Sequence, residues 1–172
     1  MYNYNKKNLE DVCSNKNFNY RLIKGRIAEA LIEQLFLKLN YNVFRYGMEN
    51  TIPGIMTLLK GVRNDVANVI RKMPDFVIQN TQTRDVFFIE VKFVSTETFS
   101  IENVGLDYPF TNAFFVIVSK KHIKCISYKD LKLGKIVTPK SKNYLGSIKE
   151  FDSDKDIIID FCHYAVKFFK NV

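Results

Sequence analysis

The feature that most constrains this chain is a pair of apolar segments, residues 73–78 and 85–94, joined by the polar residues 80–84. Short runs rich in Val, Ile and Phe around turn-forming residues are typical of a β-hairpin. The second run is apolar at odd and even positions alike, which is typical of a strand covered on both faces of its sheet. We therefore expect this hairpin to lie at the centre of the fold.

Three charged residues interrupt the hairpin: Asp75 starts its first strand, and Glu90 and Lys92 lie in its second. Strand residues two apart project to the same face, so Glu90 and Lys92 lie side by side. Buried charges are costly unless they are paired or bind an ion. One explanation is a Glu90–Lys92 ion pair at a frayed sheet end. The other is a site that holds an ion, and it accounts better for the second carboxylate, Asp75.

These residues resemble a known motif. Pro74-Asp75, followed across a hairpin by Glu90-Val91-Lys92, is similar to the signature of the PD-(D/E)xK nuclease superfamily. That superfamily includes restriction endonucleases and archaeal Holliday-junction resolvases. The Glu-x-Lys tripeptide is common by itself, so the Pro-Asp pair, the hairpin spacing and the hydrophobic strand carry the specificity. The resemblance implies a metal-dependent endonuclease that acts on phosphodiester bonds, most often in DNA.

The resemblance also implies a role for each residue. Asp75 and Glu90 would hold Mg²⁺, for which Mn²⁺ would substitute, because Mg²⁺ prefers oxygen ligands. The carbonyl of Val91 or Ile89 would add another oxygen. Lys92 would orient the nucleophile or stabilise the negative charge that develops on the phosphate.

A first helix is predicted from about Asn19 to Leu39, because apolar residues recur there at helical spacing. Asn40 is a plausible stop. Its expected buried positions are Ile23, Ile27, Ala30, Leu31, Leu35 and Leu39.

Glu29 lies on an otherwise apolar stripe of this helix, and Gly25, one turn earlier, leaves room for a close approach. The segment from Lys24 to Glu29 is similar to the Gly-x-x-x-Glu pattern in the first helix of resolvase-like members. In those members the Glu joins the metal site. The alternative is a surface face on which Glu29 pairs with Arg26 or lies beside Glu33.

The chain carries 26 Lys and Arg against 18 Asp and Glu, a formal net charge of +8. A basic balance favours a polyanionic partner, with nucleic acid before an anionic membrane surface. Lys24 and Arg26 on the first helix, and Lys120 and Lys121 in a later turn, are the candidate nucleic-acid contacts. Lys124 is a further candidate for phosphate binding.

The three cysteines, Cys13, Cys125 and Cys162, are scattered and form no C-x-x-C pair. This argues against a disulfide framework or a zinc site and favours a reducing, cytoplasmic location. No apolar run is long enough to span a bilayer, so we expect no membrane partner.

Residues 1–18 are polar, and we expect a flexible or short helical arm there. Residues 19–172 are predicted to form one nuclease domain, with a helical insertion at 47–72 that departs from compact resolvase-like nucleases. Within the insertion, Glu49 is a weak candidate for a further metal contact.

The predicted fold class is α/β, a mixed central sheet flanked by helices, with a restriction-endonuclease-like arrangement. Besides the hairpin and the first helix, the expected elements are strands at 41–46, 113–119 and 123–128, short helices at 55–60 and 64–72, and a last helix at 153–170 capped by Ser153. His122, just before the last strand, is expected in an exposed loop. The expected buried sides are Val66, Val69, Ile70 and Met73 in the helix at 64–72, and Ile157, Phe161, Tyr164, Ala165 and Phe168 in the last helix.

Two other functions stay open. The first is a nucleic-acid-binding domain that keeps the fold without catalysis. The second is an assembly subunit that uses residues 47–72 as an interface, which does not exclude nuclease activity. The joint presence of Asp, Glu and Lys favours the enzyme. A homodimer is possible, since cleavage of both strands or resolution of a junction needs two active sites.

Overall fold

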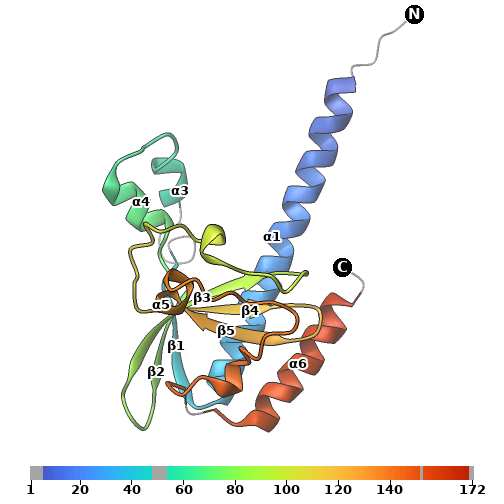
Figure 1. Ribbon diagram of the computed structural model, residues 1–172. Coiled ribbons are helices and arrows are strands. Elements are labelled where there is room, and N and C mark those ends of the chain that lie inside the picture. Colours follow the sequence, from blue (N-terminus) through green and yellow to red (C-terminus); the bar gives the residue numbers. More distant parts are fainter. Residues whose placement is uncertain (1–5, 48–53, 152, 171–172) are drawn as a thin grey trace, which may run out of the picture.

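The computed structural model describes residues 6–47, 54–151 and 153–170, with side chains described from Asn19 onward except at Met56. Glu49 lies outside the described residues. The fold is α/β, with a five-stranded mixed sheet flanked by helices, as predicted (Figure 1). In chain order the elements are α1 (Lys6–Lys38), β1 (Tyr41–Arg45), α3 (Ile55–Leu58), α4 (Asp65–Arg71), β2 (Phe76–Asn80), β3 (Val86–Phe93), η1 (Ile101–Asn103), β4 (Ala113–Val118), β5 (Ile123–Ser127), α5 (Tyr128–Lys132), η2 (Leu145–Ser147) and α6 (Lys155–Phe169).

The sheet has the strand order β1-β2-β3-β4-β5, so β3 is central as expected. Strands β1, β2 and β3 are antiparallel neighbours, β3 and β4 are parallel, and β4 and β5 are antiparallel. The β2–β3 turn is closed by Asn80, whose Oδ1 accepts hydrogen bonds from the N–H groups of Gln82 (2.8 Å) and Thr83 (3.0 Å). This side-chain turn explains why the polar segment 80–84 reverses the chain.

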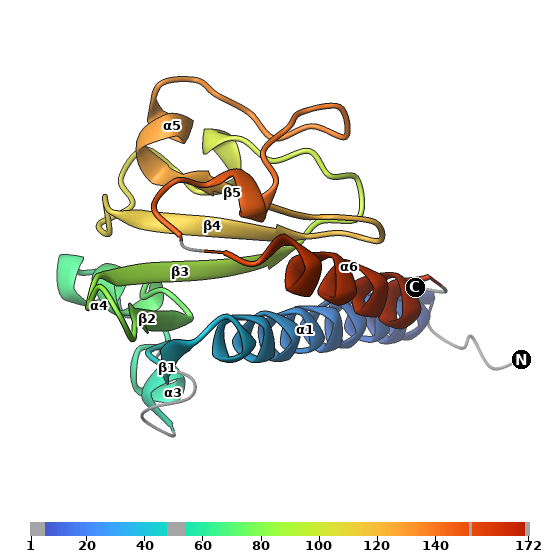
Figure 2. The ribbon, with the colours of Figure 1, turned by 90° about the horizontal axis from the view of Figure 1, so that it is seen from below.

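The sheet is covered on both faces. Helices α1 and α6 pack on one face, and α5, η1 and their connecting loops cover the other (Figure 2). Alternation along β3 follows this division: Ile89 and Val91 belong to the core beneath α1 and α6, whereas Phe88 packs against the core on the opposite face. Side chains alternate between the two faces along a strand, so Glu90 and Lys92 project from the same face as Phe88, opposite Ile89 and Val91.

The helix boundaries and buried faces differ from the prediction in several places. Helix α1 begins at Lys6, well before the expected Asn19, because no Pro or Gly interrupts the segment. Ile23 and Ala30 are exposed, since the helix turns Ala28 and Ile32 toward the sheet instead.

The buried sides expected for the insertion and the last helix are confirmed only in part. In α4 the expected Val66 and Val69 are exposed and Ala67 is buried. In α6 Tyr164 and Phe168 are exposed, whereas Ile158, Ala165 and Phe169 form the buried side. The N-cap of α6 is Asp154 rather than Ser153. Periodicity located each helix, but the neighbouring elements chose which stripe is covered.

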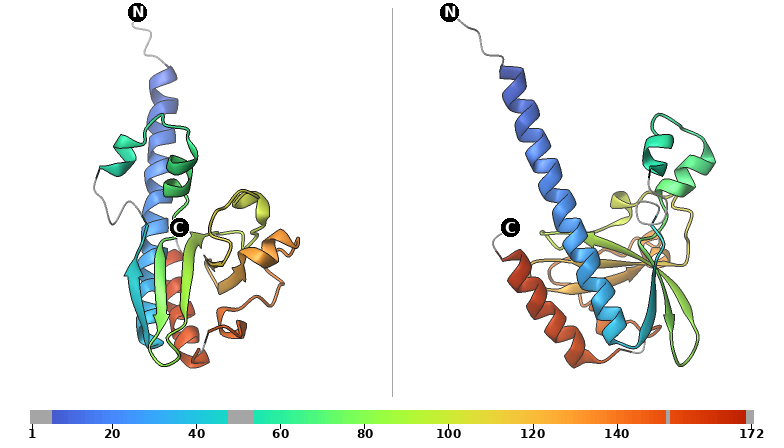
Figure 3. Two further views of the ribbon diagram at one scale, coloured as in Figure 1. Left: turned by 90° about the vertical axis from the view of Figure 1, so that its left-hand side faces the viewer. Right: turned by 180° about the vertical axis from the view of Figure 1, so that it is seen from behind.

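Helix α1 continues well past one end of the sheet, and the α3–α4 segment projects beyond the same end (Figure 3). Within the part of the chain that the structure describes, no helix is both long and apolar enough to cross a membrane.

Candidate active site

A cleft of about 790 Å³ lies between α1, the end of α4 and the exposed edge of β3. Its lining brings together the residues that the sequence singled out, although they come from three separate parts of the chain. They are Lys24, Gly25, Arg26 and Glu29 from α1, Asp75 before β2, and Glu90, Val91 and Lys92 from β3.

The edge of β3 opens because the β2–β3 ladder ends at Pro74-Asp75. The register pairs Phe76 with Ile89, so its continuation places Asp75 opposite Glu90 and Pro74 opposite Val91. Proline has no N–H to donate to the Val91 carbonyl, so this pair of the ladder does not form. The Val91 N–H donates to Asp75 Oδ2 at 2.7 Å. Because the N–H and C=O of one strand residue point to the same edge, the Val91 carbonyl also faces this opening.

Glu90 and Lys92 lie side by side, as predicted. Lys92 Nζ donates to Glu90 Oε1 at 2.5 Å, and the Glu90 side chain is 12% exposed against 44% for Lys92. Burial raises the pKa of Glu90, and the Lys92 ammonium only partly offsets this effect. For Lys92 burial acts in the opposite direction, but attraction by Glu90 and Asp75 leaves its pKa raised, so the amine is protonated.

Asp75 is a second strongly perturbed carboxyl group of the cleft. Burial, followed by repulsion from Glu90, raises the pKa of Asp75 from its ordinary value of 3.8 to about 7, against the lowering effect of the Val91 N–H. Two close carboxylates in a poorly solvated place repel each other, which is an arrangement that a cation relieves.

Glu29 forms an ion pair with Arg26 and also lines the cleft. Arg26 Nη1 lies 3.1 Å from Glu29 Oε2, so the expected surface-type pair is present. Glu29 nevertheless lines the cleft, its side chain is 16% exposed, and its charge acts on both Glu90 and Lys92. Gly25 has open space where a Cβ would stand, so this side of α1 leaves the cleft accessible.

The donor set fits a hard divalent cation. It consists of the carboxylates of Asp75, Glu90 and Glu29 and the carbonyl of Val91, all oxygen donors of the kind that Mg²⁺ prefers. Glu90 Oε2 is buried and has no hydrogen-bond partner among the described residues, which leaves an acceptor for an ion. Within the described residues, however, no three acidic, thiol or imidazole groups already form a ready-made metal cluster. The Arg26 and Lys92 pairs would have to loosen when an ion binds.

The four predicted nucleic-acid contacts separate into two groups. Lys24 and Arg26 line the cleft. Lys120 and Lys121 are not part of its lining and lie in the turn between β4 and β5. Two cleft cations were missed: Arg21, one turn before Gly25, and Arg71, four residues before Asp75.

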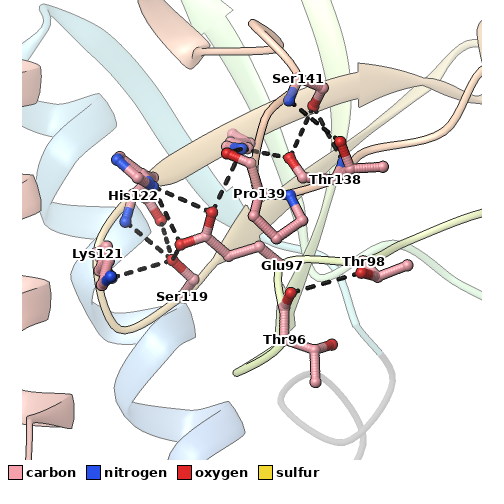
Figure 4. A network of polar contacts seen from close by, with 10 residues as sticks. Thr96, Glu97, Thr98, Ser119, Lys121, His122, Thr138, Pro139 and Ser141 are labelled. Atoms are coloured by element: carbon pink, nitrogen blue, oxygen red, sulfur yellow. Dashed lines mark hydrogen bonds and ion pairs between the residues drawn. The ribbon is translucent and has the colours of Figure 1, made fainter.

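A second polar cluster, centred on Glu97, lies just beyond the cleft wall formed by Ser95 and Thr96 (Figure 4). Glu97 Oε1 accepts a hydrogen bond from Ser119 Oγ at 2.8 Å and lies 3.0 Å from His122 Nδ1. Glu97 Oε2 lies 3.3 Å from Lys124 Nζ. Although burial opposes its charge, these partners lower the pKa of Glu97.

Lys124 is therefore no surface contact for phosphate, and that expectation is wrong. Its side chain is 1% exposed, and Nζ also donates to the carbonyl oxygens of Thr138 (2.5 Å) and Pro139 (3.1 Å). His122 lies in the β4–β5 turn, as expected, but it is only part-exposed and is a partner of Glu97. The cluster ties the segment after β3, the β4–β5 turn and the segment around Thr138 together.

The sequence did contain a signal for Lys124. It interrupts an apolar strand, between Ile123 and Cys125, in the same way that Glu90 interrupts β3. Glu97 carried no comparable signal, because a charged residue is unremarkable in a polar stretch. Its left-handed backbone conformation, with φ of 56°, is seen only in the structure.

Comparisons of the chain with protein-family models, with curated proteins and with solved structures give no match.

The raised pKa of Asp75 predicts a pH-dependent stability in the absence of metal. Between about pH 4 and pH 7 the folded protein holds a proton on Asp75 that the unfolded chain has lost. The free energy of unfolding should therefore fall as the pH rises through this window. Asp75→Asn should gain stability over the wild type by more than about 1 kcal/mol toward pH 8, since one pKa unit corresponds to about 1.4 kcal/mol. Urea unfolding with a chelator, from pH 4 to pH 8, measures this.

Glu97→Gln serves as a control of opposite sign. The folded-state pKa of Glu97 is lowered, so its contribution is present at neutral pH and lost as the pH falls. The stability that the Glu97→Gln variant loses relative to the wild type should therefore grow as the pH rises. Parallel pH profiles for Asp75→Asn and the wild type would contradict the prediction.

The Glu97–Lys124 pair predicts strong coupling between two mutations. Lys124→Met leaves a buried carboxylate with fewer partners and should lower the free energy of unfolding by about 3–5 kcal/mol. The double mutant Lys124→Met/Glu97→Gln should lose less free energy of unfolding than the two single mutants together. Urea unfolding of the four proteins completes the cycle. Lys135→Met, which breaks the exposed pair with Asp130, is the matched control and should cost less than about 1 kcal/mol. Additive effects of the two buried mutations would show that the pair contributes nothing as a unit.

Proposed function

We propose that this protein is a divalent-metal-dependent endonuclease that hydrolyses phosphodiester bonds, with DNA as the preferred substrate. The supporting observation is the meeting of Asp75, Glu90, Lys92 and Glu29 at one cleft. These residues match the PD-(D/E)xK motif and the resolvase-like first helix. Carboxylates beside an ammonium group, with cationic walls, suit a reaction in which charge builds up on a phosphate.

Each residue has a definite task in this mechanism. Asp75, Glu90, Glu29 and the Val91 carbonyl would hold Mg²⁺ or Mn²⁺. When bound, the ion supplies Lewis acidity toward the phosphate and makes a water molecule more acidic. Lys92 is protonated and can donate a hydrogen bond to a phosphate oxygen or hold the attacking water in line. The hydrogen bond from Val91 fixes the Asp75 carboxylate at the cleft edge.

The walls of the cleft suit a polyanion. Arg21, Lys24 and Arg26 on α1 face a wall that includes Arg71 of α4, and the chain as a whole has a net charge of +8. Arg71 is fixed by its bonds to the carbonyl oxygens of Leu59 and Val62. The insertion that carries α4 thus forms part of the cleft, and we assign it a role in choosing the substrate. Double-strand cleavage would require a homodimer.

A second candidate function is binding of nucleic acid without catalysis. It is favoured by the two ion pairs, Lys92–Glu90 and Arg26–Glu29, which neutralise acidic groups of the cleft without any metal. Metal affinity separates the two candidates, because a binding domain needs no cation at these residues.

Substitution of the cleft residues should abolish cleavage while leaving binding largely intact. Asp75→Asn, Glu90→Gln and Lys92→Ala should each reduce the cleavage rate by at least ~100-fold, the effect of losing one electrostatic catalytic contact. The assay uses Mg²⁺ or Mn²⁺ with linear, supercoiled, branched and single-stranded DNA, and with RNA. A chelator should stop the reaction.

Asp160→Asn, on an exposed position of α6 outside the cleft lining, is the control and should cleave at the wild-type rate. Full activity in any of the three cleft variants would overturn the assignment. Absence of cleavage by the wild type on every substrate, together with retained nucleic-acid binding, would favour the second candidate.

Nucleic-acid binding should weaken steeply with salt. About five phosphate contacts predict a log–log slope of affinity against salt near −4, because each contact releases bound counterions. Fluorescence anisotropy with a labelled oligonucleotide in chelator measures the slope. Arg21→Ala and Lys24→Ala should each make it shallower by about one. An affinity that does not change with salt would point to a partner other than nucleic acid.

A further inference from the structure

Two buried side-chain atoms have no hydrogen-bond partner among the described residues: Glu90 Oε2 and the hydroxyl of Tyr108. Buried polar groups in folded proteins nearly always have a partner. One of these atoms is an acceptor and the other is a donor. Tyr108 is 6% exposed, so bulk water does not supply its missing contact.

The packing places Tyr108 close to Glu90. The Tyr108 ring packs on Phe115, with ring centroids 5.3 Å apart, and Phe115 is the register partner of Glu90 in the parallel β3–β4 pair. Partners in register on neighbouring strands share a face and lie about 5 Å apart. The ring of Tyr108 therefore covers the part of the sheet from which Glu90 projects.

The electrostatics agree with this placement. Burial raises the pKa of Tyr108, and the charges of Glu90 and Asp75 raise it further. The hydroxyl thus keeps its proton and is available as a donor toward both carboxylates.

Tyr108 is also held firmly in place. The hydroxyl of Tyr128 donates to the carbonyl oxygens of Gly105 (3.0 Å) and Leu106 (2.8 Å), just before Tyr108 in the chain. Asp107 forms an ion pair with Lys72 at 2.5 Å, which ties the same segment to the end of α4. A side chain fixed in this way suits a positioning role, because little order is lost when it forms a contact.

We propose that Tyr108 is a positioning residue of the acidic site, whose hydroxyl donates to a buried water molecule that in turn donates to Glu90 Oε2. One bridging water can satisfy both atoms, and Asp75 offers it a further polar neighbour. A carboxylate oxygen has two lone pairs, so Oε2 can accept from this water and still bind an ion. Carboxylates that ligate metals are commonly held by such outer hydrogen bonds. The inference about metal affinity rests on the proposed function, whereas the contact itself does not.

The first test measures Mn²⁺ binding by calorimetry with wild type, Tyr108→Phe and Tyr164→Phe. Loss of an outer hydrogen bond should weaken Mn²⁺ binding by roughly ten-fold in Tyr108→Phe. Tyr164→Phe removes a tyrosine hydroxyl from an exposed position of α6 outside the cleft lining and should bind Mn²⁺ as the wild type does. Wild-type affinity in Tyr108→Phe, or equal losses in both variants, would overturn the positioning role.

The second test needs no metal. In chelator, NMR should show a hydroxyl proton that is protected from exchange, is absent in Tyr108→Phe and shifts in Glu90→Gln. A Tyr108 proton that exchanges with bulk water, or that ignores Glu90→Gln, would overturn the link to Glu90. If the link is present but the wild type neither binds Mn²⁺ nor cleaves nucleic acid, the proposed nuclease function fails and the Tyr108–Glu90 contact stands.

Discussion

The hydrogen bond from the Val91 N–H to Asp75 Oδ2, 2.7 Å long, takes the place of a ladder bond to a backbone carbonyl of β2. Proline at position 74 has no N–H to donate to the Val91 carbonyl, so the β2–β3 ladder stops here and the edge of β3 opens. The Asp75 side chain thus has two effects. It accepts the hydrogen bond of the Val91 N–H, which would otherwise be unpaired, and it is itself fixed beside Glu90 at the edge of the sheet where α1 crosses.

Cations of the chain pair with two of the three carboxylates of the cleft. Lys92 pairs with Glu90, and Arg26 pairs with Glu29. Asp75 accepts a hydrogen bond from the Val91 N–H, and burial together with repulsion from Glu90 raises its pKa to about 7. A bound cation would relieve the repulsion between Asp75 and Glu90 and release Lys92 and Arg26 toward a phosphate. Under the proposed function, competition between the cations of the chain and an external ion would decide between the catalytic and the binding-only candidate.

Surrounding contacts hold this arrangement from two sides. The Glu97–Lys124 cluster anchors the segment that follows Ser95 and Thr96, and the loop before Tyr108 is fixed by Tyr128. Both supports lie on the face of the sheet opposite α1 and α6. The face that carries Glu90 and Lys92 is thus stiffened by buried polar groups, which keep their geometry only when every partner is present.

The sequence by itself determined the central hairpin and the mixed α/β class. It also singled out Asp75, Glu90, Lys92 and Glu29, which the structure brings to one cleft, because charges in an apolar strand or stripe and a Pro-Asp pair are local signals. Only the tertiary structure decided which helix stripes are buried, since Val66, Tyr164 and Phe168 fit a helical period yet lie where no neighbour covers them. The burial of Lys124 and the positions of Glu97 and Tyr108 likewise depend on contacts between segments far apart in the chain. Such contacts produce no periodic pattern in the sequence. Local periodicity fixes an element, but the desolvation and pairing of a charge depend on what folds against it.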